Sequence, residues 1–123
     1  MTATALLFLA ALGSGKQAAE YFHQRAEPIL KRHCIRCHNH ELDDGGISFE
    51  NRESLIADRP EHGPAVVPGE PEKSALARAI RHNGEIQMPP GRKLDQRDID
   101  TLIEWIRMGA PFGNSERGAK GRK

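Results

Sequence analysis

Two cysteines and a histidine form the run Cys34-x-x-Cys37-His38, and the 123-residue chain has no other cysteine. Two thiols three positions apart on a tight turn can each form a thioether with one vinyl group of the same porphyrin. The adjoining imidazole can then ligate the iron at the ring centre. This spacing is typical of covalent attachment of a c-type haem. It predicts one haem c per chain, bound through Cys34 and Cys37, with His38 on the iron.

A zinc site is an alternative for the same cysteines, because zinc binds Cys and His in tetrahedral sets. His33, His38 and His40 stand close together in this part of the sequence. The remaining candidates, His62 and His82, stand alone rather than in the paired spacing of zinc folds. A zinc site would therefore need an irregular arrangement of ligands.

A redox-active dithiol is a second alternative for two cysteines at this spacing. Thioredoxin-like pairs occur in a βαβ context, whereas the segments that flank this motif have helical periodicity. The haem interpretation is preferred over both alternatives.

A second iron ligand is expected on the segment 88–91, whose sequence is Met-Pro-Pro-Gly. Prolines keep such a segment extended and stiff, which lowers the entropy lost when the Met88 sulfur is held on iron. Met108 is a rival, but its place near the end of a predicted helix suits packing better. An open iron site, or His62 or His40 as the ligand, are the other possibilities. Met/His ligation would fill both axial positions and favour one-electron transfer without substrate turnover.

The hydrophobic periodicity of residues 18–33 predicts an amphipathic helix that leads into the haem motif. Pro28 lacks a backbone N–H, so it should kink or restart this helix about one turn before Cys34. The polar segment 39–46 ends in Asp-Asp-Gly-Gly, which predicts a loop. We also expect His38 to donate its second ring N–H to a backbone carbonyl, as axial histidines commonly do.

Three further helices are predicted beyond this loop. Residues 52–57 are compatible with a short helix, and the Pro- and Gly-rich stretch 60–71 should not hold regular structure. Residues 71–84 predict a helix of about three turns that ends at Asn-Gly, with His82 as a surface histidine near its end. The last helix should begin after Asp95 as N-cap and end at Gly109 as a left-handed cap.

The composition limits the kinds of partner that the domain can have. The chain has 18 basic and 17 acidic side chains, which argues against nucleic acid as a partner. Aromatic residues make up only 5% of the chain, so a buried porphyrin would supply apolar surface that the core lacks. The protein without haem should be poorly folded.

The two ends of the chain are expected to lie outside the folded domain. Residues 3–12 are almost wholly apolar, and we assign residues 1–19 to a signal peptide, which predicts export to the periplasm or beyond. The apolar run is shorter than the roughly 20 residues of a membrane span, so no stable span is expected. Residues 113–123 are rich in Gly and basic side chains and are expected to be a disordered tail. This tail could steer the domain to an acidic partner, although a solvated terminal run is the preferred interpretation.

The order of these features resembles the cytochrome c fold and, more narrowly, the planctomycete-type cytochrome c domain. The resemblance covers residues 20–112. Its pieces are Pro28-Ile29-Leu30, the haem motif, Gly45-Gly46, the Gly-Pro-Ala-Val-Val-Pro-Gly stretch at 63–69, Ser74-x-Leu76, Met88-Pro89-Pro90, Trp105-Ile106 and Gly109-Ala110.

The resemblance implies an all-α domain in which three to four helices wrap around one covalently bound haem c. It implies thioether links at Cys34 and Cys37, and iron ligation by His38 and Met88. It implies no substrate, and therefore an electron carrier that serves redox partner proteins rather than an enzyme. Because members of the family are usually fused to larger regions, a second hypothesis is the electron-entry module of a larger dehydrogenase, oxidase or peroxidase-like system.

Overall fold

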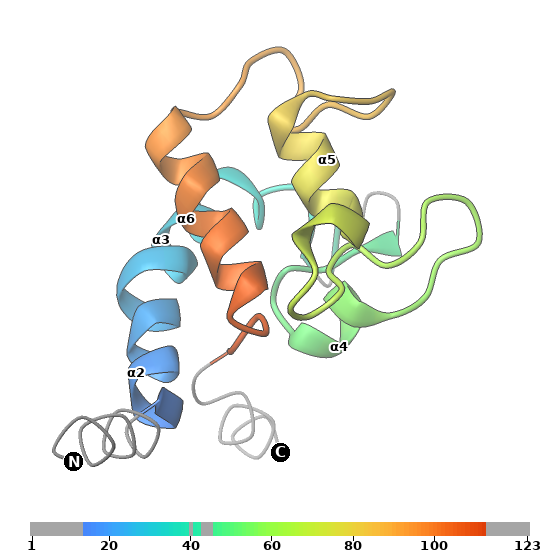
Figure 1. Cartoon of the computed structure of the whole chain (residues 1–123). Helices are drawn as coiled ribbons and strands as arrows, with labels where there is room; N and C mark the ends of the chain where they lie inside the picture. The colour runs from blue at the N-terminus through green and yellow to red at the C-terminus, as the bar shows by residue number, and fades with distance from the viewer. Residues whose placement is uncertain (1–13, 40, 43–45, 113–123) are drawn as a thin grey trace, which may run out of the picture.

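The computed structural model describes residues 14–39, 41–42 and 46–112. Five α-helices run through this part of the chain: α2 (Ser14–Tyr21), α3 (Glu27–His33), α4 (Arg52–Ile56), α5 (Ala75–Arg81) and α6 (Gln96–Arg107). A π-helical turn, η1 (Phe22–Ala26), joins α2 to α3, and a 3-10 turn, η3 (Pro71–Lys73), precedes α5. The described residues contain no β-strand, so the expected helical class is confirmed for them (Figure 1).

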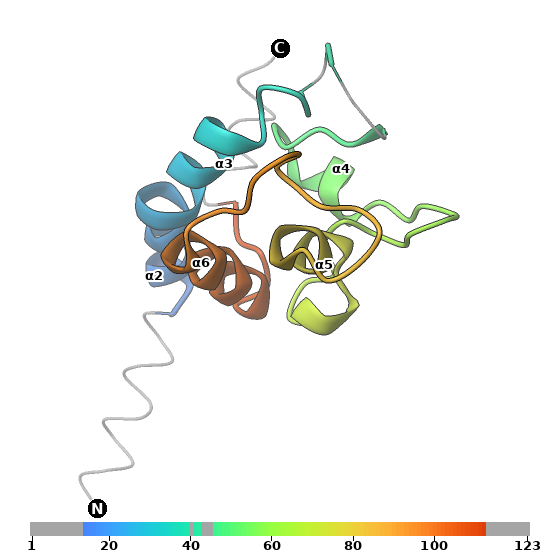
Figure 2. The same ribbon diagram turned by 90° about the horizontal axis from the view of Figure 1, so that it is seen from above.

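Helix α6 lies between the N-terminal helical run α2–η1–α3 and α5, as both ribbon views show (Figures 1 and 2). Its apolar residues recur at helical spacing, so helix formation places them on neighbouring faces. Leu102, Trp105 and Ile106 are completely buried. Because α6 contacts elements on both sides, it forms the centre of the hydrophobic core.

The predicted restart of the first helix at Pro28 is confirmed. Pro28 has no N–H to donate to the carbonyl of Gln24, four residues before it. The preceding turn is widened to a π-helical one, in which the Glu27 N–H bonds the carbonyl of Phe22. Helix α3 then begins at Glu27 with Pro28 in its first turn, where a missing N–H costs nothing. The expected boundary between residues 19 and 20 falls within α2, and the assignment of residues 1–19 to a signal peptide stays a prediction. Residues 1–13 and the expected tail, 113–123, lie outside the described part.

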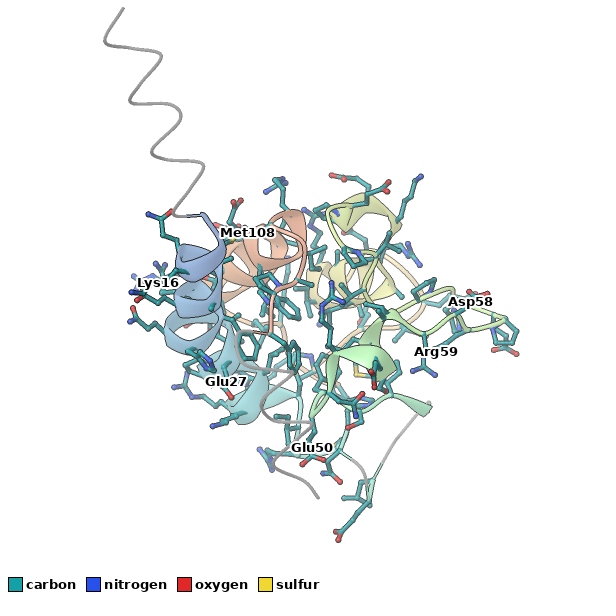
Figure 3. All side chains as sticks on the ribbon, turned by 90° about the horizontal axis from the view of Figure 1, so that it is seen from below. Lys16, Glu27, Glu50, Asp58, Arg59 and Met108 are labelled. Atoms are coloured by element: carbon teal, nitrogen blue, oxygen red, sulfur yellow. The ribbon has the colours of Figure 1, made fainter. Side chains whose placement is uncertain are left out.

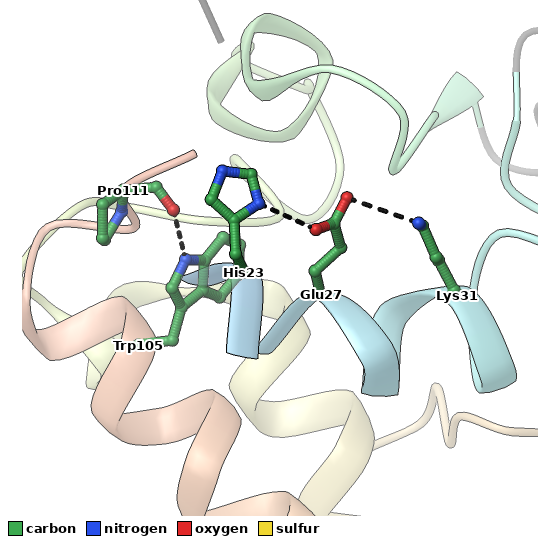
Figure 4. A network of polar contacts seen from close by, with 5 residues as sticks. All are labelled: His23, Glu27, Lys31, Trp105 and Pro111. Atoms are coloured by element: carbon green, nitrogen blue, oxygen red, sulfur yellow. Dashed lines mark hydrogen bonds and ion pairs between the residues drawn. The ribbon is translucent and has the colours of Figure 1, made fainter. Parts of the chain in front are cut away.

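Trp105 fastens the end of α6 to the chain that follows it. Its indole Nε1 donates a hydrogen bond of 2.7 Å to the carbonyl of Pro111 (Figure 4). Phe112 then stacks on Phe22 of η1, with ring centroids 4.5 Å apart.

Figure 4 also shows Glu27 between His23 and Lys31 on the exposed side of α2–α3. Exposed ion pairs of this kind contribute little to stability. The aromatic contacts therefore do more to hold η1 against the end of α6.

The prediction of one continuous helix over residues 71–84 was wrong. The chain leaves helical geometry at Ser74, whose backbone is extended, and α5 begins only after it. The Ser74 hydroxyl is buried; it accepts from the Val67 N–H at 2.8 Å and bonds the Glu70 carbonyl at 3.0 Å. These bonds compete with helix formation. The helix ends early, at a left-handed His82 (φ 57°) that is half-buried and not a surface histidine.

The two predicted ends of the last helix are confirmed. Asp95 occupies the N-cap position of α6, although its carboxylate makes no capping bond. The Asp95 carbonyl instead accepts from the Asp98 N–H at 3.0 Å. Gly109 has a φ of 105°, a backbone conformation that is unfavourable for residues with a Cβ atom. The following Ala110 N–H returns to the Trp105 carbonyl at 2.9 Å, which closes the helix.

The short helix predicted after the loop is also confirmed, as α4. Its N-cap is Asn51, whose side chain accepts from the Ser54 N–H at 2.7 Å. Residues 60–70 hold no helix or strand, as expected from their Pro and Gly content. This irregular stretch forms one side of the site described next, through His62, Gly63 and Ala65.

Candidate functional site

The Cys-x-x-Cys-His run forms a tight turn at the end of α3. The Cys34 N–H closes the helix on the Leu30 carbonyl at 2.9 Å. The Cys34 carbonyl then accepts from the N–H of Cys37 at 3.2 Å and of His38 at 3.0 Å. Local hydrogen bonding therefore holds the two thiols and the imidazole on one turn, as their spacing predicts.

One cavity of about 370 Å³ is lined by all four predicted site residues, Cys34, Cys37, His38 and Met88. Met88 is half-buried and comes from the segment between α5 and α6. This volume is within the range of small-molecule and cofactor sites. Much of the remaining lining is apolar and includes Ile47, Phe49, Ala65, Leu76, Ile80 and Leu94.

The rival ligands differ in their relation to this cavity. His62 lines it from the irregular stretch after α4, and His33 lines it from the end of α3. Met108 is not among the lining residues and is 37% exposed at the end of α6. His40 lies outside the described residues. Of the expected second iron ligands, Met88 and His62 thus share the cavity with His38.

Phe49 positions His38, and the sequence analysis did not identify it. The Phe49 N–H donates a hydrogen bond of 2.7 Å to the His38 carbonyl, and the two rings pack with centroids 5.6 Å apart. The His38 Nδ1 atom is buried and has no hydrogen-bond partner among the described residues. The expected bond from this nitrogen to a backbone carbonyl is therefore not formed with any described residue. Ring packing and the backbone bond fix the position of His38 instead.

Asn39 is a second supporting residue that the sequence analysis missed. Its side-chain nitrogen donates to the Ile35 carbonyl at 2.6 Å, and its side-chain oxygen accepts from the N–H groups of Glu41 and Leu42 at 2.9 and 2.8 Å. An asparagine directly after the motif was an available signal, because Asn side chains commonly bond the backbone two or three residues on. These bonds hold the chain on both sides of His38.

The burial of Cys34 argues against a redox-active dithiol. Desolvation raises the pKa of this thiol to about 12. Redox-active pairs depend on a thiol whose pKa is lowered, since the thiolate is the nucleophile. The described residues also lack the βαβ unit that surrounds thioredoxin-like motifs. Cys34 is therefore suited to burial against an apolar group more than to thiolate chemistry.

The zinc alternative finds no ligand set in the part of the chain that the structure describes. There, no group of three His, Cys, Asp or Glu side chains is placed to hold a metal ion. The donor set that does converge contains two thiols, one imidazole and one thioether. A thioether is a poor ligand for zinc but a common axial ligand of haem iron. The residues present therefore fit a haem c better than a metal ion alone.

These features define a helical domain whose cavity carries the side chains that a c-type cytochrome needs. Residues 34–92 match the model of the family described as Planctomycete cytochrome C. This confirms the resemblance, over a narrower range than residues 20–112. The match includes all four predicted site residues, whereas α2, α3 and α6 lie outside it.

No curated protein and no solved structure matches the chain significantly. The match to this family implies covalently bound haem c with its iron, and a role in electron transfer. Among the described residues, no helix combines the length and apolar character needed to cross a bilayer.

Proposed function

We propose that this domain is a monohaem c-type cytochrome that carries one electron at a time between redox partner proteins. In this proposal Cys34 and Cys37 hold haem c through thioethers, and His38 and Met88 are its axial iron ligands. The observation that carries the proposal is the convergence of these four side chains on one largely apolar cavity.

The residues of the chain have distinct tasks in such a carrier. Haem c supplies the one-electron couple of its iron. His38, packed on Phe49, and Met88 would both ligate the iron, and small ligands would then be kept from the metal. The soft Met88 sulfur favours the ferrous state and raises the reduction potential relative to bis-histidine ligation. Apolar residues such as Leu76 and Ile80 exclude water from the cavity. In this proposal the chain therefore binds the haem and sets its reduction potential, and it positions no substrate.

The attachment itself is tested on protein matured in a host that exports it and attaches haem c. Intact mass should exceed the mass of the matured polypeptide by one haem, and a pyridine spectrum should be of the c type. Replacement of both Cys34 and Cys37 by Ser should abolish the added mass. The matched control is Ser48→Ala, which leaves both thiols in place. Wild-type protein that contains zinc and no covalent haem would disprove the proposal.

A further inference from the structure

Arg59 contributes a buried cationic atom to the wall of the same cavity. It lies between α4 and the irregular stretch 60–70 and is half-buried. Its Nη2 atom donates a hydrogen bond of 2.7 Å to the Ser54 carbonyl. Its Nε atom is buried and has no hydrogen-bond partner among the described residues. One side of the guanidinium is therefore anchored, while a buried N–H donor on it is unused.

Gly46 confines the guanidinium from another direction. A Cβ atom at Gly46 would stand 3.2 Å from Arg59 Nη1, a separation tighter than most such contacts. Gly46 also has a φ of 74°, which favours glycine at this position. The group is thus held between the Ser54 carbonyl and the Gly46 backbone. Figure 3 shows Arg59 next to Asp58, on the opposite side of the molecule from Lys16.

A guanidinium that is always charged needs an anion when part of it is buried. No ion pair is formed by Arg59 with any carboxylate of the described residues. Apolar side chains that line the same cavity, such as Phe49 and Ala65, supply no acceptor. The free donor therefore calls for a ligand that brings its own negative charge into this cavity.

We propose that Arg59 binds a propionate carboxylate of the haem, an inference that rests on the proposed function. A porphyrin of this kind carries two carboxylates on one edge, and a guanidinium presents N–H donors in a plane that matches a carboxylate. Arg59 therefore determines which edge of the macrocycle faces the segment that follows α4. It would also add a positive charge beside the propionate, which favours the ferrous state.

Arg78 provides a matched control. It lines the same cavity and carries the same charge, but it is exposed, and its Nη2 already donates to the His62 carbonyl at 3.1 Å. An exposed cation interacts weakly because water and salt screen it. If charge alone mattered, loss of Arg78 and loss of Arg59 would have similar effects.

The test compares Arg59→Gln, Arg59→Lys and Arg78→Gln in haem-loaded protein. Resonance Raman spectra report the propionate bending band, and redox titration reports the potential. We expect Arg59→Gln to shift the band to lower frequency and to lower the potential. Arg78→Gln should leave the band at the wild-type position. Arg59→Lys should shift the band, because the Nε donor is lost, but should largely retain the potential, because the charge stays.

Two results would overturn this inference. One is a propionate band that is unchanged in both Arg59 variants, and the other is an equal shift in Arg78→Gln. If Arg59→Gln does not acquire haem, the position of the propionate band in Arg59→Lys tests the inference. A wild-type protein without covalent haem would instead refute the proposed function, so the two failures are distinguishable by intact mass.

Discussion

The backbone N–H of Met88 donates a hydrogen bond to the carbonyl of Ala79, with an N···O distance of 3.0 Å. Ala79 is a buried residue of α5, and both residues line the cavity that contains His38. The bond ties the segment before the prolines to a helix of the core. The thioether is therefore presented from a fixed backbone, and an iron held by His38 could bind it without ordering a free loop.

Replacement of Met88 by Ala should open one axial position of the iron. We expect the reduction potential to fall, because the soft sulfur ligand is lost, and carbon monoxide to bind the reduced protein rapidly. Potentiometry and visible spectra with carbon monoxide measure both effects.

Met108→Ala is the control for this change, because Met108 is 37% exposed and lies outside the cavity lining. It should change neither the potential nor the binding of carbon monoxide. Equal behaviour of the two variants, or rapid binding by the wild-type protein, would contradict Met88 as the axial ligand.

Replacement of Asn39 by Ala should weaken the chain on both sides of His38. It removes three side-chain hydrogen bonds, to Ile35, Glu41 and Leu42. These hydrogen bonds are partly exposed and resemble those of a helix-capping side chain. We therefore expect the free energy of unfolding to fall by about 1–2 kcal/mol. Guanidinium unfolding of the haem-loaded protein measures it. Asn83→Ala, on an exposed turn after α5, should change stability by less than about 0.5 kcal/mol. Equal losses for the two variants would argue against the role of Asn39.

Arg52 joins α4 to the end of α6. Its Nε donates to the Ala110 carbonyl and its Nη2 to the Gly109 carbonyl, both at 2.9 Å. Arg52→Ala should lower the free energy of unfolding by about 2 kcal/mol, because charged hydrogen bonds to backbone carbonyls are lost. Chemical unfolding is again the measurement, and Arg97→Ala, on the exposed face of α6, is the control. A loss in Arg52→Ala no larger than in the control would contradict the link.

His33 makes the stability of the folded state depend on pH. Its Nδ1 lies 3.3 Å from the Arg92 Nη2, which makes the neutral imidazole an acceptor for the guanidinium. Burial, and then the positive charge of Arg92, lower the pKa of His33 below its ordinary value of 6.5. Below pH 6.5 the unfolded chain takes up a proton that the folded chain does not. The contribution of His33 is therefore fully present above pH 6.5 and is lost as the pH falls toward its lowered pKa.

Unfolding free energies of the wild type and His33→Gln, measured from pH 5 to 8, test this dependence. As the pH falls below 6.5, the free energy of unfolding of the wild type should fall relative to that of His33→Gln. A difference that does not vary with pH would contradict the interpretation. His23→Gln, an exposed histidine on the opposite side of Glu27 from Lys31, is the matched control.

Several features of this fold are determined by local interactions, and these features could be predicted from the sequence. The turn from Cys34 to His38 depends on bonds between residues three or four positions apart. The restart at Pro28 follows from a missing N–H, and the end of α6 at Gly109 follows from backbone sterics. Such features depend on the residue types alone and need no knowledge of distant neighbours.

Other features depend on burial or on a distant partner, and these could not be predicted from the sequence. The break at Ser74 depends on a buried hydroxyl that bonds Val67 and Glu70, and periodicity does not show that burial. Phe49 was missed because its contact with His38 joins residues that only the fold brings together.

The sequence by itself determined the chemistry of the motif, the helical class and most helix ends, because these follow from covalent spacing and short-range backbone bonding. Only the tertiary structure decided that Met88 shares a cavity with His38, fifty positions away, and that Arg59 keeps a buried donor in its wall. The physical reason is that long-range packing depends on how all apolar faces are buried together, and no local segment contains that information.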